Sequence, residues 1–276
     1  MSSRAEEERV SGPLVVIPTY DERENLPGIV ARVRTAVPAA SVLVVDDGSP
    51  DGTGELAEAI AETDAAVHVL HRRGKEGLGA AYLAAFDWGL GRGFDPIVQL
   101  DADGSHPPEQ LPALLDMLET TDAAGRKPDV VIGSRWVSGG SIVNWPRRRV
   151  WLSKFGSTYS RWMLGLHVKD VTAGYRVYRA GALRSLHLED VHTRGYGFQV
   201  DMTWRAVVAG LRIVEAPITF VEREHGRSKM SAAIVLEAIG RVTAWGIARR
   251  FRPKGASETP RQATAETNDD RRPSRA

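Results

Sequence analysis

PIVQLDADGSHPPE, residues 96–109, joins an apolar run to a pair of carboxylates and then to a turn. The first five residues predict a short buried strand, and Asp101 and Asp103 follow that strand directly. A Gly-Ser pair then ends the extended segment, and the His-Pro-Pro-Glu turn leads into a helix. Two carboxylates held at one strand end repel each other. A divalent cation, which prefers oxygen ligands, is therefore the expected partner of this pair.

Segments typical of strands and of helices alternate on both sides of this stretch. Short apolar, β-branched runs predict strands at 14–17, 42–45, 67–70, 97–100 and 130–133. Helices are expected at 25–36, 54–63, 80–89 and 111–121. This alternation predicts an α/β, Rossmann-like fold with a mostly parallel sheet flanked by helices. Ligands of such sheets bind outside the carboxyl ends of the strands. Acidic or aromatic residues stand at three of these ends, at 20–22, 46–47 and 101–103.

The second half of the chain is less regular. A strand is expected at 175–178, a helix at 198–209, and a strand pair or one bent strand at 213–214 and 218–221. Two amphipathic helices are expected at 150–166 and 232–251. The apolar positions of the first recur at helical spacing at Trp151, Phe155, Tyr159, Trp162 and Leu166. One face of each helix can bury against the sheet, but apolar residues beside clustered Lys and Arg also suit an anionic membrane surface.

Composition limits the class of protein. The chain has 276 residues and a net charge of +1, which gives no overall argument for nucleic acid as a partner. It has no cysteine, which excludes disulfides, thiolate metal sites and cysteine nucleophiles. No apolar run is long enough to span a bilayer. We expect a flexible N-terminus at 1–12, one domain at 13–252 and a disordered tail at 253–276.

The loops after the first strands exclude two nucleotide-binding motifs. A dinucleotide fold needs Gly-x-Gly-x-x-Gly after its first strand, where this chain has Pro-Thr-Tyr-Asp-Glu. The loop at 74–79 lacks the Gly-Lys-Ser/Thr ending of a P-loop and is interpreted as a flexible loop over a site. Asp47 can accept hydrogen bonds from a base or ribose, Tyr20 can stack on a base, and Thr53 is expected to cap the following helix. His106 is interpreted as a turn residue near the site, without assigned chemistry.

Asp101 and Asp103 can serve as turn and cap residues or can hold a metal. The two other polar strand ends nearby favour the metal, which would bridge the two phosphates of a nucleotide diphosphate leaving group. Basic residues are clustered, at Arg135, Arg147, Arg148, Arg149, Lys154, Arg223, Arg227 and Lys229. Most are expected to be solvated, but Arg135 directly follows a buried strand. Because arginine suits phosphate, a second basic patch indicates a second phosphate on the acceptor.

Six motifs, taken in order, resemble those of one enzyme family. They are residues 18–22, 45–53, 101–109, 133–135, Trp145-Pro146-x-x-Arg149-x-x-x-Ser153 and Glu222-Arg223-x-x-Gly226-x-Ser228-Lys229-Met230. Together they resemble the dolichol- or polyprenol-phosphate mannose synthases, which are inverting glycosyltransferases of family 2 with the GT-A fold. The resemblance covers about residues 13–250.

The resemblance implies GDP-mannose as donor, Mg²⁺ or Mn²⁺ as cofactor and a polyprenyl phosphate as acceptor. The guanosine part would contact Pro18, Tyr20, Glu22, Val45 and Asp47. The nucleotide sugar would contact Asp101, Ala102 and Asp103, and the metal would bind Asp103 and Ser105. Ser105 stands where some relatives carry glutamine. Arg223 and Lys229 would hold the donor phosphates, and Arg135, Arg149 and Ser153 the acceptor phosphate.

The chemistry is consistent with that implication. A phosphate monoester is already anionic at pH 7, so it needs no general base, and Asp103 and Arg135 are expected to act by charge and position. We expect inversion to a β-linked mannosyl phosphate. The protein is expected to be peripheral, on the cytoplasmic face of a membrane, with a membrane-anchoring protein as a further partner. The alternatives are another donor such as UDP-glucose, or a non-catalytic nucleotide-sugar-binding subunit.

Overall fold

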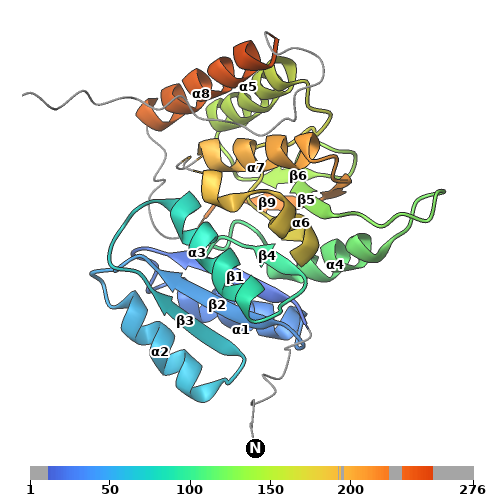
Figure 1. Ribbon diagram of the computed structural model, residues 1–276. Coiled ribbons are helices and arrows are strands. Elements are labelled where there is room, and N and C mark those ends of the chain that lie inside the picture. Colours follow the sequence, from blue (N-terminus) through green and yellow to red (C-terminus); the bar gives the residue numbers. More distant parts are fainter. Residues whose placement is uncertain (1–11, 192, 194–195, 224–231, 251–276) are drawn as a thin grey trace, which may run out of the picture.

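In the computed structural model, the described residues are 12–191, 193, 196–223 and 232–250, and they are built around a seven-stranded sheet (Figure 1). The strand order is β3-β2-β1-β4-β7-β5-β8. Only β7 runs antiparallel to its neighbours in this described sheet. The strands are β1 Leu14–Thr19, β2 Ser41–Asp46, β3 Val67–His71, β4 Ile97–Gln99, β5 Val130–Ser134, β7 Arg176–Tyr178 and β8 Ile213–Pro217. The predicted mostly parallel α/β fold is confirmed.

Helices cover both faces of the sheet because the strand side chains alternate between two apolar layers. On β1, Leu14 and Val16 face one layer, and Val15 and Ile17 face the other. The first layer is formed with α3 Leu78–Gly91, α5 Arg147–Leu164, α6 Ala180–Ser185, α7 Tyr196–Val208 and α8 Ala232–Arg250. The second is formed with α1 Leu26–Ala36, α2 Thr53–Thr63 and α4 Leu111–Glu119. Two short 3-10 helices are η1 Pro108–Gln110 and η2 Leu188–Asp190.

The strand register brings the polar strand ends to one edge. Thr19 at the end of β1 pairs with Asp46 at the end of β2, and Val16 pairs with Gln99 of β4. Since β1 lies between β2 and β4, the loops that follow these three strands share the crevice in which α/β proteins bind ligands. The five strands and four helices expected in the first half are all present, with ends that differ by at most two residues.

The segment 213–221 is one bent strand rather than a hairpin. Its first part is β8, and its second part is β9 Thr219–Val221, which leaves the main sheet to pair in parallel with β6 Ser141–Val143. Ile218, at the bend, is buried, and its N–H donates to the carbonyl of Ser134. The bend carries the chain across the carboxyl edge, so that the residues after β9 reach the loop that follows β4.

Helices α5 and α8 lie side by side at one end of the molecule (Figure 1). Both predicted amphipathic helices are present, but the aromatic stripe of α5 does not bury against the sheet. Its buried side carries Ser157, Ser160, Met163 and Leu164, whereas Trp151 and Trp162 are 71% and 67% exposed. Within the described ranges, no helix combines the length and the apolar character needed to cross a membrane.

Three expectations concern residues outside the described ranges. The structure does not describe residues 1–11 or 251–276. The expected flexible N-terminus at 1–12, apart from Gly12, and the expected disordered tail at 253–276 therefore lie outside the described residues. The predicted donor-phosphate ligand Lys229 and the basic residue Arg227 also lie outside the described residues.

Candidate active site

The two carboxylates after β4 lie in a compact acidic loop. Asp103 accepts a hydrogen bond from the backbone N–H of Ser105 at 3.1 Å, and its Oδ2 lies 3.0 Å from Nη1 of Arg223. Asp101 Oδ1 accepts a bond of 3.4 Å from the hydroxyl of Tyr82. Burial raises the pKa of Asp101, and the neighbouring Asp103 charge adds to that rise. Because its charged form is disfavoured, the loop favours a positively charged partner.

The residues of this loop fit a divalent cation. The donors are carboxylate oxygens, which hard cations prefer, and the Arg223 guanidinium pairs with Asp103 and lowers the pKa of Asp101 through its charge. Asp103 Oδ2 already contacts a cation, the Arg223 side chain. In the described part of the chain, no three acidic or histidine side chains are grouped to hold a metal. Ser105 is buried, and its carbonyl accepts from Val221 N–H, so β9 is attached to the loop. The metal role of Ser105 stays a prediction.

His106 lies in the bend that follows the two carboxylates, and it is buried in the site. Its side chain is 3% exposed, and its ring lies between the rings of Tyr175 and Phe220, at centroid distances of 5.3 and 5.2 Å. Nδ1 lies 3.5 Å from Asp101 Oδ2, and no described residue gives this buried nitrogen a well-aligned hydrogen bond. Burial lowers the pKa of His106. A histidine before two prolines predicts a turn, and nothing in the sequence indicates that its ring is buried.

On the predicted guanosine side, two cations of the loop after β3 contact residues expected to bind the donor. Arg72 Nη1 lies 2.5 Å from Asp47 Oδ1, and Lys75 Nζ lies 3.8 Å from the centroid of the Tyr20 ring. Burial raises the pKa of Asp47 in spite of the opposing charge of Arg72. Sequence reasoning did not assign either cation to this region.

The remaining guanosine residues are placed by β1 and β2. Pro18 of β1 pairs with Val45 of β2, and Glu22 is buried just beyond. The expectation that Thr53 caps α2 is wrong, because Thr53 is the first residue of that helix. Its N–H donates to the carboxylate of Asp51, and its hydroxyl accepts from the N–H of Glu22. Thr53 therefore joins the two loops.

On the predicted acceptor side, Arg135 is bound by a carboxylate that sequence reasoning missed. Its Nε and Nη2 donate to the two oxygens of Asp170, each at 2.7 Å, and its backbone N–H donates to Oδ2 at 3.0 Å. Asp170 is 0% exposed and Arg135 is 6% exposed. The guanidinium carbon also lies 5.4 Å from the ring centroids of Trp136, Trp145 and Phe220. This geometry fixes one orientation of Arg135.

Two consecutive residues after β9 connect the donor and acceptor sides. Glu222 Oε1 lies 2.6 Å from Nη1 of Arg149, while Arg223 contacts Asp103. The backbone N–H of Glu222 donates to the carbonyl of Val143, which fixes the segment on β6. The other oxygen of Glu222 is buried without a hydrogen bond to a described residue. Glu222 was not predicted as a site residue.

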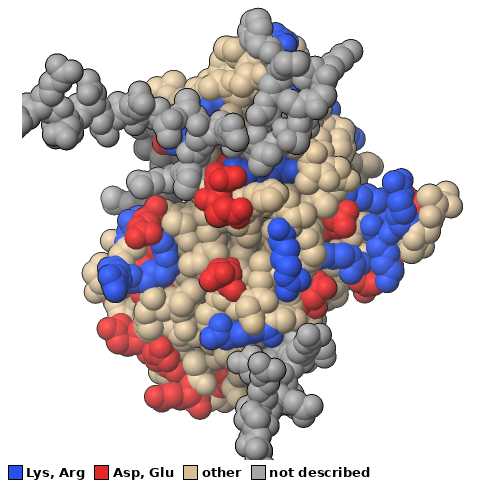
Figure 2. Space-filling view, viewed as in Figure 1, with Lys and Arg blue, Asp and Glu red and all other residues tan. Residues whose placement is uncertain are grey.

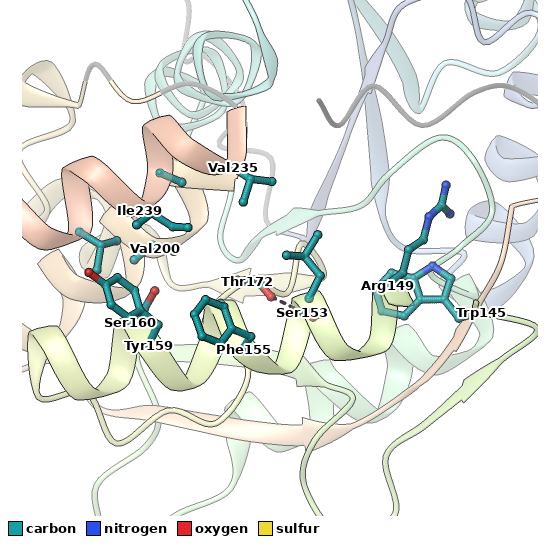
Figure 3. Close-up of a pocket in the computed structure, with 14 residues that line it drawn as sticks. Trp145, Arg149, Ser153, Phe155, Tyr159, Ser160, Thr172, Val200, Val235 and Ile239 are labelled. Atoms are coloured by element: carbon teal, nitrogen blue, oxygen red, sulfur yellow. Dashed lines mark hydrogen bonds between the residues drawn. The ribbon is translucent and has the colours of Figure 1, made fainter. Parts of the chain in front are cut away.

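A largely apolar pocket adjoins Arg149, between α5, α7 and α8 (Figure 3). Trp145, Arg149 and Ser153 lie toward one end, and Ser153 and Thr172 are joined by a hydroxyl contact of 3.4 Å. The remaining lining is Leu152, Phe155, Gly156, Tyr159, Ser160, Val200, Val235, Ala238, Ile239 and Val242. A charged end on an apolar pocket suits an amphiphile with an anionic head.

Most of the predicted site residues lie in two groups. The donor group holds Asp101, buried Ala102, Asp103, Ser105 and Arg223. The acceptor group holds Arg135, Arg149 and Ser153, with Thr172 contacting both Arg135 and Ser153.

Known proteins share much of this chain's sequence and fold. The family described as "Glycosyl transferase family 2" matches residues 14–186, which include both carboxylates, Arg135 and Arg149. The chain belongs to glycosyltransferase family 2.

Two relatives of this family 2 glycosyltransferase are similar over most of its length. The undecaprenyl-phosphate mannosyltransferase of Micrococcus luteus is 58% identical over 86% of this chain and 95% of the relative. The polyprenol monophosphomannose synthase of Mycolicibacterium smegmatis is 56% identical over 86% of this chain and 88% of the relative. The resemblance to the polyprenol-phosphate mannose synthases is confirmed.

The fold of this glycosyltransferase is also found among solved structures. Glucosyl-3-phosphoglycerate synthase from Mycobacterium tuberculosis, solved with Mn²⁺, UDP and glucosyl-3-phosphoglycerate, has a TM-score of 0.60 at 20% identity. That match covers 87% of this chain and 79% of the other. It supports the GT-A fold.

Proposed function

We propose that this glycosyltransferase transfers mannose from GDP-mannose to a polyprenyl phosphate and releases GDP. The observation that carries the proposal is the apolar pocket whose charged end holds Arg149 and Ser153, beside the buried Arg135. A phosphate head can contact the arginines while the chain behind it enters the pocket. The names of the two relatives that are more than half identical agree with mannose as the transferred sugar and a polyprenyl phosphate as the acceptor.

On the donor side, Asp103 and Ser105 would hold Mg²⁺ or Mn²⁺ beside the donor diphosphate. The cation, when bound, offsets the charge that develops on the departing diphosphate. Arg223 turns from Asp103 to the diphosphate and adds a second positive charge. Asp47 accepts hydrogen bonds from the nucleoside, and Tyr20 offers a ring face, once Arg72 and Lys75 give way or bind the donor themselves.

On the acceptor side, no general base is needed. The phosphate monoester is already anionic near neutral pH, since its second pKa is about 6. Arg135, fixed by Asp170, and Arg149 offset the repulsion between the two phosphate-bearing substrates and orient one phosphate oxygen toward the anomeric carbon. That oxygen forms the new C–O bond as the bond to the diphosphate oxygen breaks. In-line displacement inverts the configuration and gives a β-linked mannosyl phosphate.

The outer surface of α5 and α8 is the proposed membrane contact. Large exposed side chains on it are Trp151, Phe155, Trp162, Leu236 and Ile247. Arg147 and Arg148 are exposed near the start of α5, and Arg249 and Arg250 near the end of α8. Apolar and basic side chains together suit an anionic bilayer. The pocket lies between the same helices, so this placement brings it to the source of a lipid acceptor. A membrane-anchoring partner protein stays a prediction.

Vesicle flotation tests the membrane contact. Wild type should float with phosphatidylglycerol vesicles more than with phosphatidylcholine vesicles, and the double variant Trp151→Ser, Trp162→Ser should float less. Arg126→Gln with Lys127→Gln removes two charges from the distant loop before β5 and serves as the control. Equal flotation of wild type and the tryptophan variant would contradict this assignment.

The transfer assay tests the function itself. Mannose from GDP-mannose should appear on a short polyprenyl phosphate, stop with EDTA and resume with excess Mg²⁺ or Mn²⁺. Asp103→Ala should abolish transfer, while Asp116→Ala on the exposed side of α4 should not change it. Transfer from UDP-glucose but not from GDP-mannose would favour the other donor. No turnover with any donor would favour a non-catalytic subunit. An α-linked product, identified by NMR, would contradict inversion.

A further inference from the structure

We propose that His106 is a positioning residue for the donor: its Nδ1–H holds the Asp101 carboxylate in the orientation that receives the nucleotide sugar. This inference rests on the proposed function, because the resemblance to the mannose synthases implies that Asp101 contacts the nucleotide sugar of that reaction. Nδ1 of His106 is buried 3.5 Å from Asp101 Oδ2 and has no hydrogen bond to any residue that the structure describes. A buried polar group left unpaired is unfavourable, so the site favours closing this contact.

The contact needs only a small approach. Hydrogen bonds in ligand-free sites are often long and shorten when the substrate binds. The rings of Tyr175 and Phe220 pack against the imidazole and restrict its position. Gly174 lies beside both groups, since a Cβ at that position would be in ordinary van der Waals contact, at 3.4 Å, with Asp101 Oδ2 and with His106 Cε1. The ring is therefore held in place and aimed at one acceptor.

Asp101 would then be held through both oxygens. Tyr82 already donates to Oδ1, and His106 would donate to Oδ2. Tyr82 is fully buried, and the ring of Phe198 stacks against it at a centroid distance of 5.9 Å, so this donor is also rigid. A carboxylate fixed from two sides keeps one rotamer, which lowers the entropy lost when the donor binds.

Three substitutions separate this role from simple core packing. His106→Asn places an amide N–H near the position of Nδ1, His106→Gln places it near Nε2, and His106→Phe keeps a ring without any donor. We expect His106→Asn to keep the KM for GDP-mannose and the Kd for GDP with Mn²⁺ within about threefold of wild type. His106→Gln and His106→Phe should raise both by about tenfold or more, as for loss of a hydrogen bond to a charged group. The KM for the acceptor should change less than twofold.

A melting curve for each variant reports on packing alone, and the exposed His167→Phe serves as the surface control. Equal donor affinities for the Asn, Gln and Phe variants would overturn the proposal, as would donor affinities that simply follow the melting temperatures. Loss of Mn²⁺ binding in all three variants would make His106 a metal ligand instead. Failure of the proposed function is seen separately, since wild type would then not transfer mannose while GDP binding still compares the variants.

Discussion

At the scale of single residues, Asp170 determines where the Arg135 guanidinium lies on the predicted acceptor side. Arg135 is buried, and a buried guanidinium is tolerated only when it is paired and hydrogen-bonded. Asp170 supplies both conditions through three bonds, and its own N–H donates to Glu215 at 2.9 Å. Asp170 therefore sets both the position and the direction of the Arg135 side chain.

Asp170→Asn should weaken both folding and acceptor binding. Breaking a buried ion pair by removing one partner lowers the free energy of unfolding by about 3–5 kcal/mol. Denaturant unfolding measures this loss, and initial rates at varied polyprenyl phosphate should show an acceptor KM raised about tenfold or more. The matched control is Asp201→Asn, which breaks the buried pair with Arg205 in α7, away from the pocket's charged end. It should lower stability similarly and leave the ratio of acceptor KM to donor KM unchanged. An equal rise of acceptor KM in both variants would contradict the role of Asp170.

The sequence predicts a site residue more reliably when that residue directly follows a strand than when it comes from a distant part of the chain. Asp101, Asp103 and Arg135 each follow a predicted strand, and the carboxyl-end rule assigns them to one edge. Asp170 meets Arg135 across 35 residues, and no local pattern marks it as a partner. Glu222 lies beside Arg149 only because β9 leaves the main sheet, which the residue pattern left open.

At the scale of elements, the small residues of α5 and α8 determine how closely the two helices pack. Gly246 of α8 is buried, and a Cβ there would lie 2.9 Å from the backbone carbonyl oxygen of Met163 on α5. Together with the serines on the buried side of α5, this close approach turns the large aromatics outward. Helical periodicity located the aromatic stripe of α5 in the sequence. It could not show that the side of α5 with the small residues would be the buried one.

Gly246→Ala should destabilise the protein in spite of the higher helix propensity of alanine. The propensity gain is about 1 kcal/mol, whereas overpacking against backbone costs typically 1–3 kcal/mol. The matched control is Gly240→Ala in the same helix, where a Cβ would meet nothing within 4 Å. Thermal unfolding should show a lower Tm for Gly246→Ala and an equal or higher Tm for Gly240→Ala. The reverse order would mean that the two helices do not pack this closely.

The packing of β3 against α3 should add a pH dependence to stability. His68 of β3 lies 5.2 Å from the Trp88 ring, and burial, helped by the charge of Arg92, lowers its pKa in the folded state. The unfolded chain therefore binds a proton more readily, so stability is present above about pH 6.5 and falls below it. Between pH 7.5 and 5.5, the Tm of wild type should fall more than that of His68→Gln. Parallel Tm profiles would refute a buried neutral His68.

At the scale of the whole molecule, cations of the candidate active site are matched by carboxylates of the same chain. The pairs are Asp47 with Arg72, Asp103 with Arg223, Asp170 with Arg135 and Glu222 with Arg149. The net charge is +1, and Figure 2 shows acidic and basic side chains interspersed over the visible face. In the proposed function, substrate phosphates would therefore compete with these internal carboxylates for the arginines.

Glu222→Gln should strengthen the binding of phosphates to Arg149. The neutral amide competes less for the guanidinium, so the KM for polyprenyl phosphate should fall about threefold to tenfold. Inhibition by phosphatidylglycerol in mixed micelles should increase in the same variant. Glu237→Gln on α8 removes the same charge without touching Arg149 and should change neither quantity. An acceptor KM that rises in Glu222→Gln would show that Glu222 assists acceptor binding rather than opposing it.

The pairing of Glu222 with Arg149 would matter at the proposed membrane contact, where headgroup phosphates far outnumber the acceptor. A bare arginine at the pocket mouth would be occupied by those headgroups most of the time. A tethered carboxylate excludes anions that make a single weak contact. In the proposed reaction it would give way to a phosphate that also reaches Arg135 and whose chain fills the apolar pocket. In the proposed reaction, the Glu222 carboxylate competes with every anion for Arg149. This competition thus lets the enzyme discriminate the rare polyprenyl phosphate from the abundant phospholipid headgroups.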